Sequence, residues 1–241
     1  MSNNSFTFQK FTIHQDRCAM KVGTDGVLLG AWAHVKEAKH ILDIGCGSGL
    51  VTLMAAQRNA MAQVTGIEID TAAANDAEMN AQASPFKERV EILQADVLQI
   101  AEHCHYKHYD CILSNPPYHE EDLLPPTTTR AQARHTAGGG LTFAALLRAV
   151  SLLIDTEAPN ASFSVILPTP AVSKFTTLAT LHNLHLTHRT DVVTRKGKPC
   201  KRVLLEFKTQ STTCIHNEIE LLGNGNERST DYQALCADFY L

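Results

Sequence analysis

A short proline-rich segment, Asn115-Pro116-Pro117-Tyr118, follows an apolar run and carries groups suited to chemistry at an amine. The side-chain oxygen of Asn115 and the backbone carbonyl of Pro116 can each accept a hydrogen bond from one NH₂ group. Two such acceptors favour the positive charge that develops on the nitrogen as it attacks an electrophile. The prolines fix the backbone, and Tyr118 offers a flat face for a stacked base. We therefore expect Asn115, Pro116 and Tyr118 to be catalytic, the alternative being an ordinary turn.

Residues 42–49, Leu-Asp-Ile-Gly-Cys-Gly-Ser-Gly, have the composition of a cofactor-binding loop. Glycines at Gly45, Gly47 and Gly49 let the backbone approach a ligand closely, and a helix that begins there offers free N–H groups. Dinucleotide sites use the spacing Gly-x-Gly-x-x-Gly instead. The carboxylate of Asp43 would repel a pyrophosphate but can bind a cationic amine. Spacing and charge therefore favour S-adenosylmethionine over a nicotinamide dinucleotide.

Further polar residues are expected around the same cofactor. Glu68 ends the next apolar run, where its carboxylate can accept both ribose hydroxyls, and Asp96 follows a third run and can accept from the adenine amine. Thr24 and Asp25 can fold over the cofactor from the N-terminal side. Each of these four residues could instead serve as a helix cap. Asn115 is expected to contact the cofactor as well as the amine.

These residues require a sheet that brings the ends of several strands together. Apolar runs predict strands at residues 40–44, 64–67, 90–93, 109–114, 162–167, 184–193 and 203–208. Helical patterns lie between them, at residues 24–35, 50–58, 71–83, 97–103, 141–154 and 171–182. This alternation predicts an α/β fold with a doubly wound, mostly parallel seven-stranded sheet and a terminal antiparallel hairpin.

The chain divides into three parts by this pattern. Residues 1–35 are expected to be an N-terminal extension packed on a catalytic domain at 36–208. Residues 209–241 are expected to form an appendage with a strand at 218–222 and a helix at 230–241. The irregular segment 119–140 is long for a loop within a compact domain, which indicates a functional role.

Positive charge is concentrated near the end of the predicted sheet. The whole chain has a formal charge of −4, whereas residues 189–208 carry seven Lys/Arg and two acids, a local charge of +5. A basic stripe on an acidic body suits contact with a phosphate backbone, although a solvated hairpin explains it equally well. The residues that we expect to contact RNA are Arg130, Arg134, Arg195, Lys196, Lys198, Lys201 and Arg202.

Composition argues against other classes of protein. The seven cysteines form no Cys-x-x-Cys pair, which indicates reduced thiols and a cytoplasmic location. No apolar run approaches the ~18 residues that cross a bilayer, so we expect no membrane partner. The cluster His103-Cys104-His105…His108 lacks partners at zinc-site spacing, so we expect no metal.

These motifs resemble known enzymes. The glycine loop with Glu68 and Asp96 resembles class I methyltransferases over residues 40–170, and Asn-Pro-Pro-Tyr resembles the motif of amino-methyltransferases of nucleic acids and glutamine side chains. Residues 11–32, 130–135 and 232–241 are similar to the bacterial tRNA1(Val) adenine-37 N6-methyltransferase family. This resemblance implies methyl transfer to N6 of an adenine beside the anticodon, with a flipped or splayed loop base.

Several alternatives stay open at this point. A guanine-N2 methyltransferase of ribosomal RNA would use the same motif. A glutamine-N5 methyltransferase would usually carry an N-terminal helical domain, for which about 35 residues are too few. A degenerate fold that only binds RNA is disfavoured by the intact Asp43, Glu68 and Asn115. The oligomeric state is not determined by the sequence, and a monomer would suffice.

Overall fold

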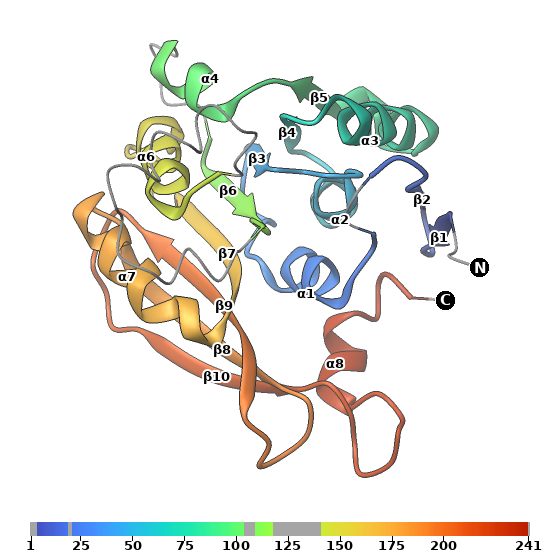
Figure 1. The fold of residues 1–241 in the computed structure, drawn as a ribbon, viewed down its shortest axis with the longest axis vertical. Coiled ribbons are helices and arrows are strands. Elements are labelled where there is room, and N and C mark those ends of the chain that lie inside the picture. Colours follow the sequence, from blue (N-terminus) through green and yellow to red (C-terminus); the bar gives the residue numbers. More distant parts are fainter. Residues whose placement is uncertain (1–3, 19–20, 104–108, 118–140, 241) are drawn as a thin grey trace, which may run out of the picture.

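The computed structural model of the chain describes residues 4–18, 21–103, 109–117 and 141–240 (Figure 1). Its centre is an eight-stranded sheet in the order β10-β8-β9-β7-β6-β3-β4-β5. The strands are β3 (His40–Ile44), β4 (Gln63–Glu68), β5 (Val90–Gln94), β6 (Cys111–Ser114), β7 (Ser162–Pro168), β8 (His185–Val193), β9 (Cys200–Lys208) and β10 (Ile215–Glu220). All neighbours pair in parallel except β9, which is antiparallel to both β7 and β8.

Helices cover both faces of this sheet, as expected for a doubly wound fold (Figure 1). The helices are α1 (Thr24–Trp32), α2 (Leu50–Arg58), α3 (Thr71–Ala83), α4 (Val97–His103), α6 (Phe143–Leu153), α7 (Val172–Leu181) and α8 (Thr230–Leu235). Short 3-10 helices occupy Lys87–Arg89 and Thr169–Ala171. No helix of the described chain is long and apolar enough to cross a membrane.

Two hydrophobic clusters form the core because successive strand residues point to opposite faces. Ile41 of β3 lies in the cluster shared with α1, α2 and α8, whereas Leu42 lies in the cluster shared with α4, α6 and α7. Both side chains have no exposed surface. The near-continuous apolar runs of the sequence are thus explained by strands that are buried on both sides.

Side-chain caps fix where several helices begin. Asp70 accepts a hydrogen bond from the amide of Ala73 at 2.8 Å and starts α3, as the sequence predicts. Thr142 caps α6 in the same way, and Ser229 caps α8. Such caps satisfy N–H groups that have no partner inside the helix.

The C-terminal stretch differs from its predicted form. All seven strands expected in the sheet are present, and the strand expected at 218–222 is β10, which joins the same sheet as its eighth strand, parallel to β8. The helix expected to reach residue 241 ends at Leu235. Beyond it, the carbonyls of Ala237 and Tyr240 accept hydrogen bonds from the side chain of Gln9, so tertiary contacts replace the helical ones.

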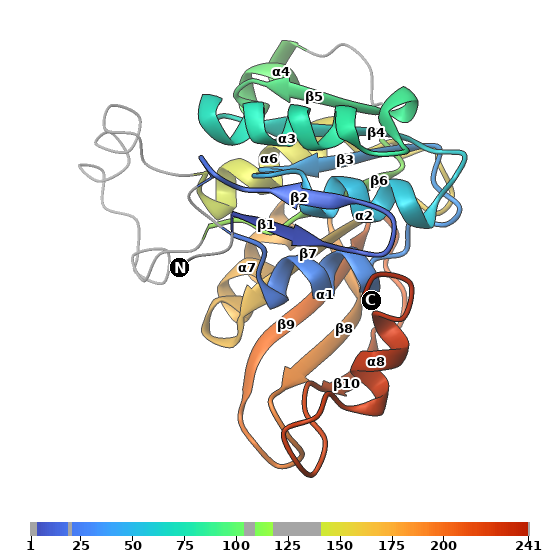
Figure 2. The ribbon, with the colours of Figure 1, turned by 90° about the vertical axis from the view of Figure 1, so that its right-hand side faces the viewer.

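The N-terminal stretch contains a hairpin that the sequence analysis missed. Strands β1 (Ser5–Thr7) and β2 (Thr12–His14) pair in antiparallel fashion. Three-residue strands give too short an alternation to stand out in a sequence. Figure 2 shows this hairpin beside α2 and α3, and β8–β10 turned relative to β3 by the twist of the sheet.

Candidate active site

Strand register brings the predicted site residues to one edge of the sheet. Ile44 of β3 lies opposite both Ile67 of β4 and Ser114 of β6. The next residues along these strands, Gly45, Glu68 and Asn115, therefore emerge side by side at the carboxyl edge. Strand β3 lies between β4 and β6, so the chain order reverses here, and such switch points are where ligands of parallel sheets bind.

The glycine loop joins β3 to α2 in a conformation that requires glycine. Gly45, Gly47 and Gly49 have φ angles of +72°, +55° and +84°, in the left-handed region. The amide of Gly45 donates to the carbonyl of Ile67 at 2.8 Å, which holds the loop against β4. A Cβ on Gly49 would lie 3.4 Å from Ala77 of α3. The loop thus ends at the N-terminus of α2 with its backbone open to close approach by a ligand.

Glu68 connects β4 to this loop through its carboxylate. Oε2 accepts the amide of Gly47 and Oε1 accepts the amide of Asp70, each at 2.9 Å. An ionised carboxylate has about four acceptor positions. Two of these are used here, so the group keeps the capacity to accept two hydroxyls.

Asp43 lies beneath the glycine loop rather than at its surface. Its side chain is buried, and Oδ2 accepts the hydroxyl of Thr52 at 2.7 Å. Burial raises the pKa of the Asp43 carboxyl to about 7; the Thr52 hydrogen bond lowers it, and the nearby charge of Glu68 raises it. A cation bound beside these two acids would favour the ionised form.

Asn115 follows β6 and lies against the first helix. The hydroxyl of Ser114 donates to the carbonyl of Ile44 at 2.9 Å and so fixes the end of β6 to the start of the glycine loop. A Cβ on Gly26 of α1 would lie 3.9 Å from Nδ2 of Asn115. Asn115 is half-buried and Pro116 is buried, whereas Tyr118 lies outside the described residues. The amide is thus close to both the loop and α1.

Asp96 follows β5, and two residues that the sequence analysis missed, Ile69 after β4 and Thr52 in α2, lie in the same region. Oδ1 of Asp96 accepts the amide of Leu98 at 2.9 Å, which caps α4 and leaves the other carboxylate oxygen for a further donor. Ile69, between Glu68 and Asp70, is 64% exposed although it is apolar. Neither this exposure nor the buried bond from Thr52 to Asp43 follows from composition alone.

Two residues predicted for different ligands pair with each other. Nε of Arg202, expected to bind RNA, donates to Oδ2 of Asp25, expected to bind the cofactor, at 2.7 Å. Asp25 and Thr24 form the first turn of α1, and Arg202 belongs to β9. This ion pair joins the start of α1 to the basic hairpin.

The basic turn between β8 and β9 extends from the same edge of the sheet, since β8 runs parallel to β7 and β3. Lys196, Lys198 and Lys201 are exposed there. The guanidinium of Arg195 donates to the carbonyls of Gly223 and Asn224 and to Oδ1 of Asn226, at 2.9 to 3.2 Å. Arg195 therefore anchors the turn, and the lysines face solvent. Arg130 and Arg134 lie outside the described residues.

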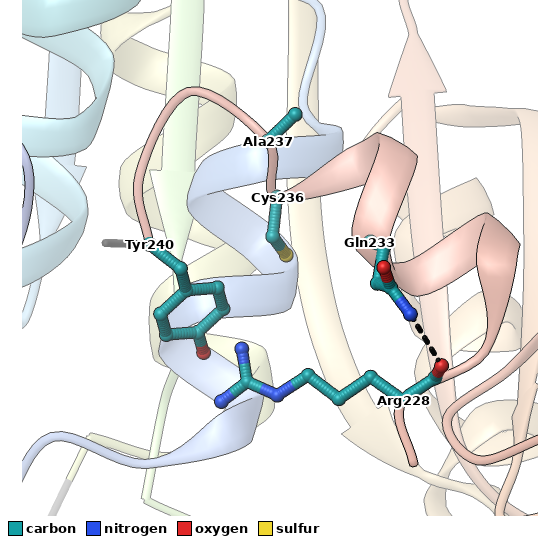
Figure 3. A pocket seen from close by; sticks show the side chains of 5 residues that line it. All are labelled: Arg228, Gln233, Cys236, Ala237 and Tyr240. Atoms are coloured by element: carbon teal, nitrogen blue, oxygen red, sulfur yellow. Dashed lines mark hydrogen bonds between the residues drawn. The ribbon is translucent and has the colours of Figure 1, made fainter.

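Other features of the described chain lie apart from this edge. An open hollow of about 510 Å³ beside α8 is lined by none of the predicted site residues (Figure 3). Its wall includes Arg228, whose guanidinium lies 3.8 Å from the ring centroid of Tyr240. Within the described ranges, no group of three or more His, Cys, Asp or Glu residues could hold a metal. Residues 104–108 of the histidine cluster are outside those ranges.

The site fits a cationic nucleoside cofactor better than a dinucleotide. Two acids, Asp43 and Glu68, lie close enough for the charge of one to affect the other. Their negative charge would oppose a pyrophosphate and attract an ammonium or sulfonium group. The loop backbone beside them is free of side chains at the three glycines, which leaves room for close contact.

Comparison with known proteins agrees with this geometry. Residues 21–142 match the family model described as the methyltransferase small domain. The chain is 42% identical to the tRNA1(Val) (adenine(37)-N6)-methyltransferase of Phocaeicola vulgatus, over 100% of this chain and 99% of that protein. It is also 42% identical to the protein of the same name from Yersinia enterocolitica, over 100% of this chain and 94% of that protein.

Solved structures share the fold at low sequence identity. A predicted O-methyltransferase from Agrobacterium tumefaciens superposes with a TM-score of 0.68 and 18% identity, covering 89% of this chain and 96% of that one. The 16S rRNA N2 G1207 methyltransferase of T. thermophilus, solved with AdoMet and guanosine, gives a TM-score of 0.59 and 18% identity. That comparison covers 86% of this chain and 50% of the other. The fold is therefore that of class I methyltransferases.

Proposed function

The chain belongs to the tRNA1(Val) (adenine(37)-N6)-methyltransferase family, and we propose that it methylates the exocyclic N6 amine of adenine 37 in tRNA1(Val). The methyl donor of this family is S-adenosylmethionine, which supplies an activated methyl group on a sulfonium when bound. The observation that carries the proposal is the register that places Asn115 beside the glycine loop and Glu68. A nucleoside-binding loop and an amine-binding amide thus share one edge.

We assign the cofactor contacts to residues around the glycine loop. Glu68 accepts the ribose hydroxyls with its remaining lone pairs, and the free carboxylate oxygen of Asp96 accepts the adenine amine. The exposed side chain of Ile69 covers a face of the purine. Gly45, Gly47 and Gly49 approach the cofactor with their backbone. Asp43 acts from beneath, as a buried negative charge that favours a cation.

Thr24 and Asp25 complete the cofactor site at the start of α1. Their place beside Asn115 is supported by the short distance between Gly26 and the Asn115 amide. Because Asp25 is held by Arg202, its carboxylate has a fixed position at the first turn of the helix.

Asn115 and Pro116 act on the amine itself. Their oxygens accept the two N–H groups of N6 and so favour a nitrogen lone pair that points away from the ring's conjugation. Positive charge that develops on this nitrogen is stabilised by the same two acceptors. No base is needed before transfer, because alignment of amine and methyl supplies much of the rate. The N6–methyl bond would form as the methyl–sulfur bond breaks, leaving a neutral thioether, and the surplus proton on N6 would then pass to water. Tyr118 stacks on the adenine.

The RNA backbone contacts the positively charged side chains near this edge of the sheet. Lys196, Lys198 and Lys201 are exposed on the basic turn, and we include Arg130, Arg134, Arg195 and Arg202 as RNA-binding residues, with Arg195 and Arg202 acting by shaping the turn. The target base lies in a single-stranded loop and is flipped out of its stack to reach Asn115. The proposed site draws on a single chain, so a monomer suffices. A tRNA substrate places the enzyme in the cytoplasm.

Transfer of labelled methyl groups to tRNA transcripts, followed by nucleoside mass spectrometry, tests this function. Wild-type protein should yield N6-methyladenosine, and Asn115→Ala should lower the rate at saturating cofactor at least about 100-fold. Asn160→Ala is the matched control, because Asn160 is exposed and bonds only to Glu37 at 2.9 Å in the described contacts. N2-methylguanosine as the product would indicate the second candidate, a guanine-N2 enzyme, whose support here is likeness of fold.

A further inference from the structure

One face of α3 carries two buried polar side chains that have no part in the proposed mechanism. Asp76 and Asn80 are one helical turn apart, and each is 1% exposed. Ala77, between them, lies against Gly49 of the cofactor loop. Burying polar groups costs free energy unless they are fully hydrogen-bonded, so their partners indicate what they hold in place.

Asn80 joins the cofactor loop to the N-terminal stretch. Its Nδ2 donates to the carbonyl of Ser48 at 2.9 Å and to the carbonyl of His14 at 2.8 Å. Its Oδ1 accepts the amide of His14 at 2.8 Å. One side chain therefore binds the backbone of two segments 34 residues apart in sequence. Both donors and the acceptor of the amide are used.

Asp76 holds the continuation of the same N-terminal stretch. A single oxygen, Oδ2, accepts the amides of Arg17 at 2.9 Å and Cys18 at 3.0 Å. These bonds place residues 14–18, here called the arm, along α3 at the carboxyl edge of the sheet. Sγ of Cys18 would lie 3.7 Å from a Cβ on Gly47, so the end of the arm touches the glycine loop.

The loop is thereby held from two sides. Glu68 binds the amide of Gly47 from the β4 side, and Asn80 binds the carbonyl of Ser48 from the α3 side. We propose that Asp76 and Asn80 are positioning residues, which clamp the arm against the glycine loop and keep that loop in its cofactor-binding geometry. This inference rests on the proposed cofactor site.

The effect of losing these hydrogen bonds on cofactor affinity follows from the fraction of molecules in which the arm and the glycine loop are in place. If only a fraction of the molecules have the arm and loop in place, the apparent affinity for the cofactor falls by that fraction. Once cofactor saturates the site, the loop is in place and the chemical step is unaffected. Loss of the clamp should therefore raise Kd and KM for the cofactor and leave kcat nearly unchanged.

Three variants separate hydrogen bonding from side-chain volume. Asp76→Asn keeps an oxygen that can accept both amides, whereas Asp76→Ala does not. Asn80→Asp keeps the shape of the side chain but removes both donors. Calorimetric titration with S-adenosylhomocysteine should show affinity at least about tenfold weaker for Asp76→Ala and Asn80→Asp, and within about threefold of wild type for Asp76→Asn.

A measurement on the wild-type protein covers the case in which these variants do not fold. Hydrogen exchange of the peptide that contains residues 14–18 should slow on addition of S-adenosylhomocysteine, together with that of residues 45–49. Protection of the loop without protection of the arm would overturn the proposal. So would a folded Asp76→Ala or Asn80→Asp with wild-type affinity. Wild-type protein that does not bind S-adenosylhomocysteine would instead refute the proposed function.

Discussion

Negative charge beside a glycine loop is the residue-scale feature that, we propose, selects the cofactor. Asp43 is buried under the loop, and the charge of Glu68 acts on it. Two neighbouring acids at a site are costly unless a cation joins them. We therefore propose that the same two carboxylates destabilise the free protein and strengthen its binding of a sulfonium compound.

This balance predicts opposite effects of Asp43→Asn on stability and on cofactor binding. Burial raises the Asp43 pKa from an ordinary 3.8 to about 7. The folded state therefore binds more protons than the unfolded state between these values, and stability is lost as pH rises from about 4 to about 7. The uncharged variant should gain stability relative to wild type over this range, by up to about 4 kcal/mol at and above about pH 7.

Cofactor titrations over the same pH range complete this test. Affinity of the wild type should rise relative to that of Asp43→Asn as Asp43 ionises near pH 7, because a cation prefers the ionised carboxyl. The comparison of two proteins cancels the ionisation of the cofactor itself. A constant ratio of affinities across the range would contradict the assigned role of Asp43.

At this scale the sequence predicts which residues lie at the site better than it predicts which residues pair with each other. The positions of Gly45, Glu68 and Asn115 at strand ends follow from apolar runs and spacing. The pairing of Asp25 with Arg202, 177 residues apart, depends on which strand lies next to α1. Strand order is a long-range property that periodicity does not encode, so each residue could be assigned only to a separate ligand.

At the scale of elements, α1 packs very closely on α2, and Gly26 of the same helix lies near Asn115. A Cβ on Gly30 would lie 2.7 Å from Sδ and 2.9 Å from Cβ of Met54. Both distances are shorter than ordinary contacts, so the helices approach at a residue without a side chain. The close approach of α1 to α2 thus depends on the absence of a side chain at Gly30.

Gly30→Ala should consequently destabilise the protein. The clash with Met54 costs about 1–3 kcal/mol, which exceeds the gain of up to about 1 kcal/mol that alanine brings to a helix. Urea unfolding measures the change. A double-mutant cycle with Met54→Ala should show favourable coupling, because the smaller residue makes room for the added methyl. Additive effects of the two changes would contradict this packing.

The basic turn is the second element that leads to a prediction. Replacing Lys196, Lys198 and Lys201 by glutamine should raise KM for tRNA about 10-fold to 100-fold at moderate salt with kcat and cofactor affinity retained. The slope of log KM against log salt should fall by about 2. Glutamine at Lys36, Lys39 and Lys87 is the matched control, since these exposed lysines precede β3 and β5 at the opposite edge. Equal effects of the two triple variants on KM for tRNA would refute a specific RNA-binding role of the basic turn.

Long periodic elements could be predicted, and short or tertiary-dependent ones could not. Helices α2 and α3 have their predicted bounds, since apolar spacing and the Asp70 cap mark them locally. The hairpin of β1 and β2 and the early end of α8 depend on contacts with distant segments. The predicted strand near residue 218 is found at Ile215–Glu220, and its partner β8 could not be read from the tail itself.

At the scale of the whole molecule, the two ends of the chain join one core. The amide of Gln9 donates to the carbonyl of Phe239 at 2.9 Å. One hydrophobic cluster includes residues from the N-terminal stretch, the sheet and the C-terminal stretch, among them Phe8, Phe11, Ile13, Ile41, Val64, Tyr232 and Phe239. We propose that the three predicted parts, 1–35, 36–208 and 209–241, unfold as one unit.

Phe239→Ala tests this unity far from the active site. Phe239 is 1% exposed, and its removal leaves a cavity that costs about 3–5 kcal/mol. The single tryptophan, Trp32, donates to Thr190 at 3.0 Å and reports on the packing of α1 against β8. In one cooperative unit, fluorescence of Trp32 and far-UV circular dichroism should shift to lower urea together.

The exposed neighbour provides the control for this last change. Asp238→Ala should alter stability by no more than about 0.5 kcal/mol, because its side chain is exposed. If Phe239→Ala moved only part of the circular dichroism change to lower urea and left the Trp32 fluorescence transition where it is in the wild type, the C-terminal stretch would be a separate appendage. Coincident transitions would instead mean that the C-terminal stretch stabilises α1, and through α1 the position of Asn115. Methyl transfer should then be lost at the temperature at which the C-terminal stretch unfolds.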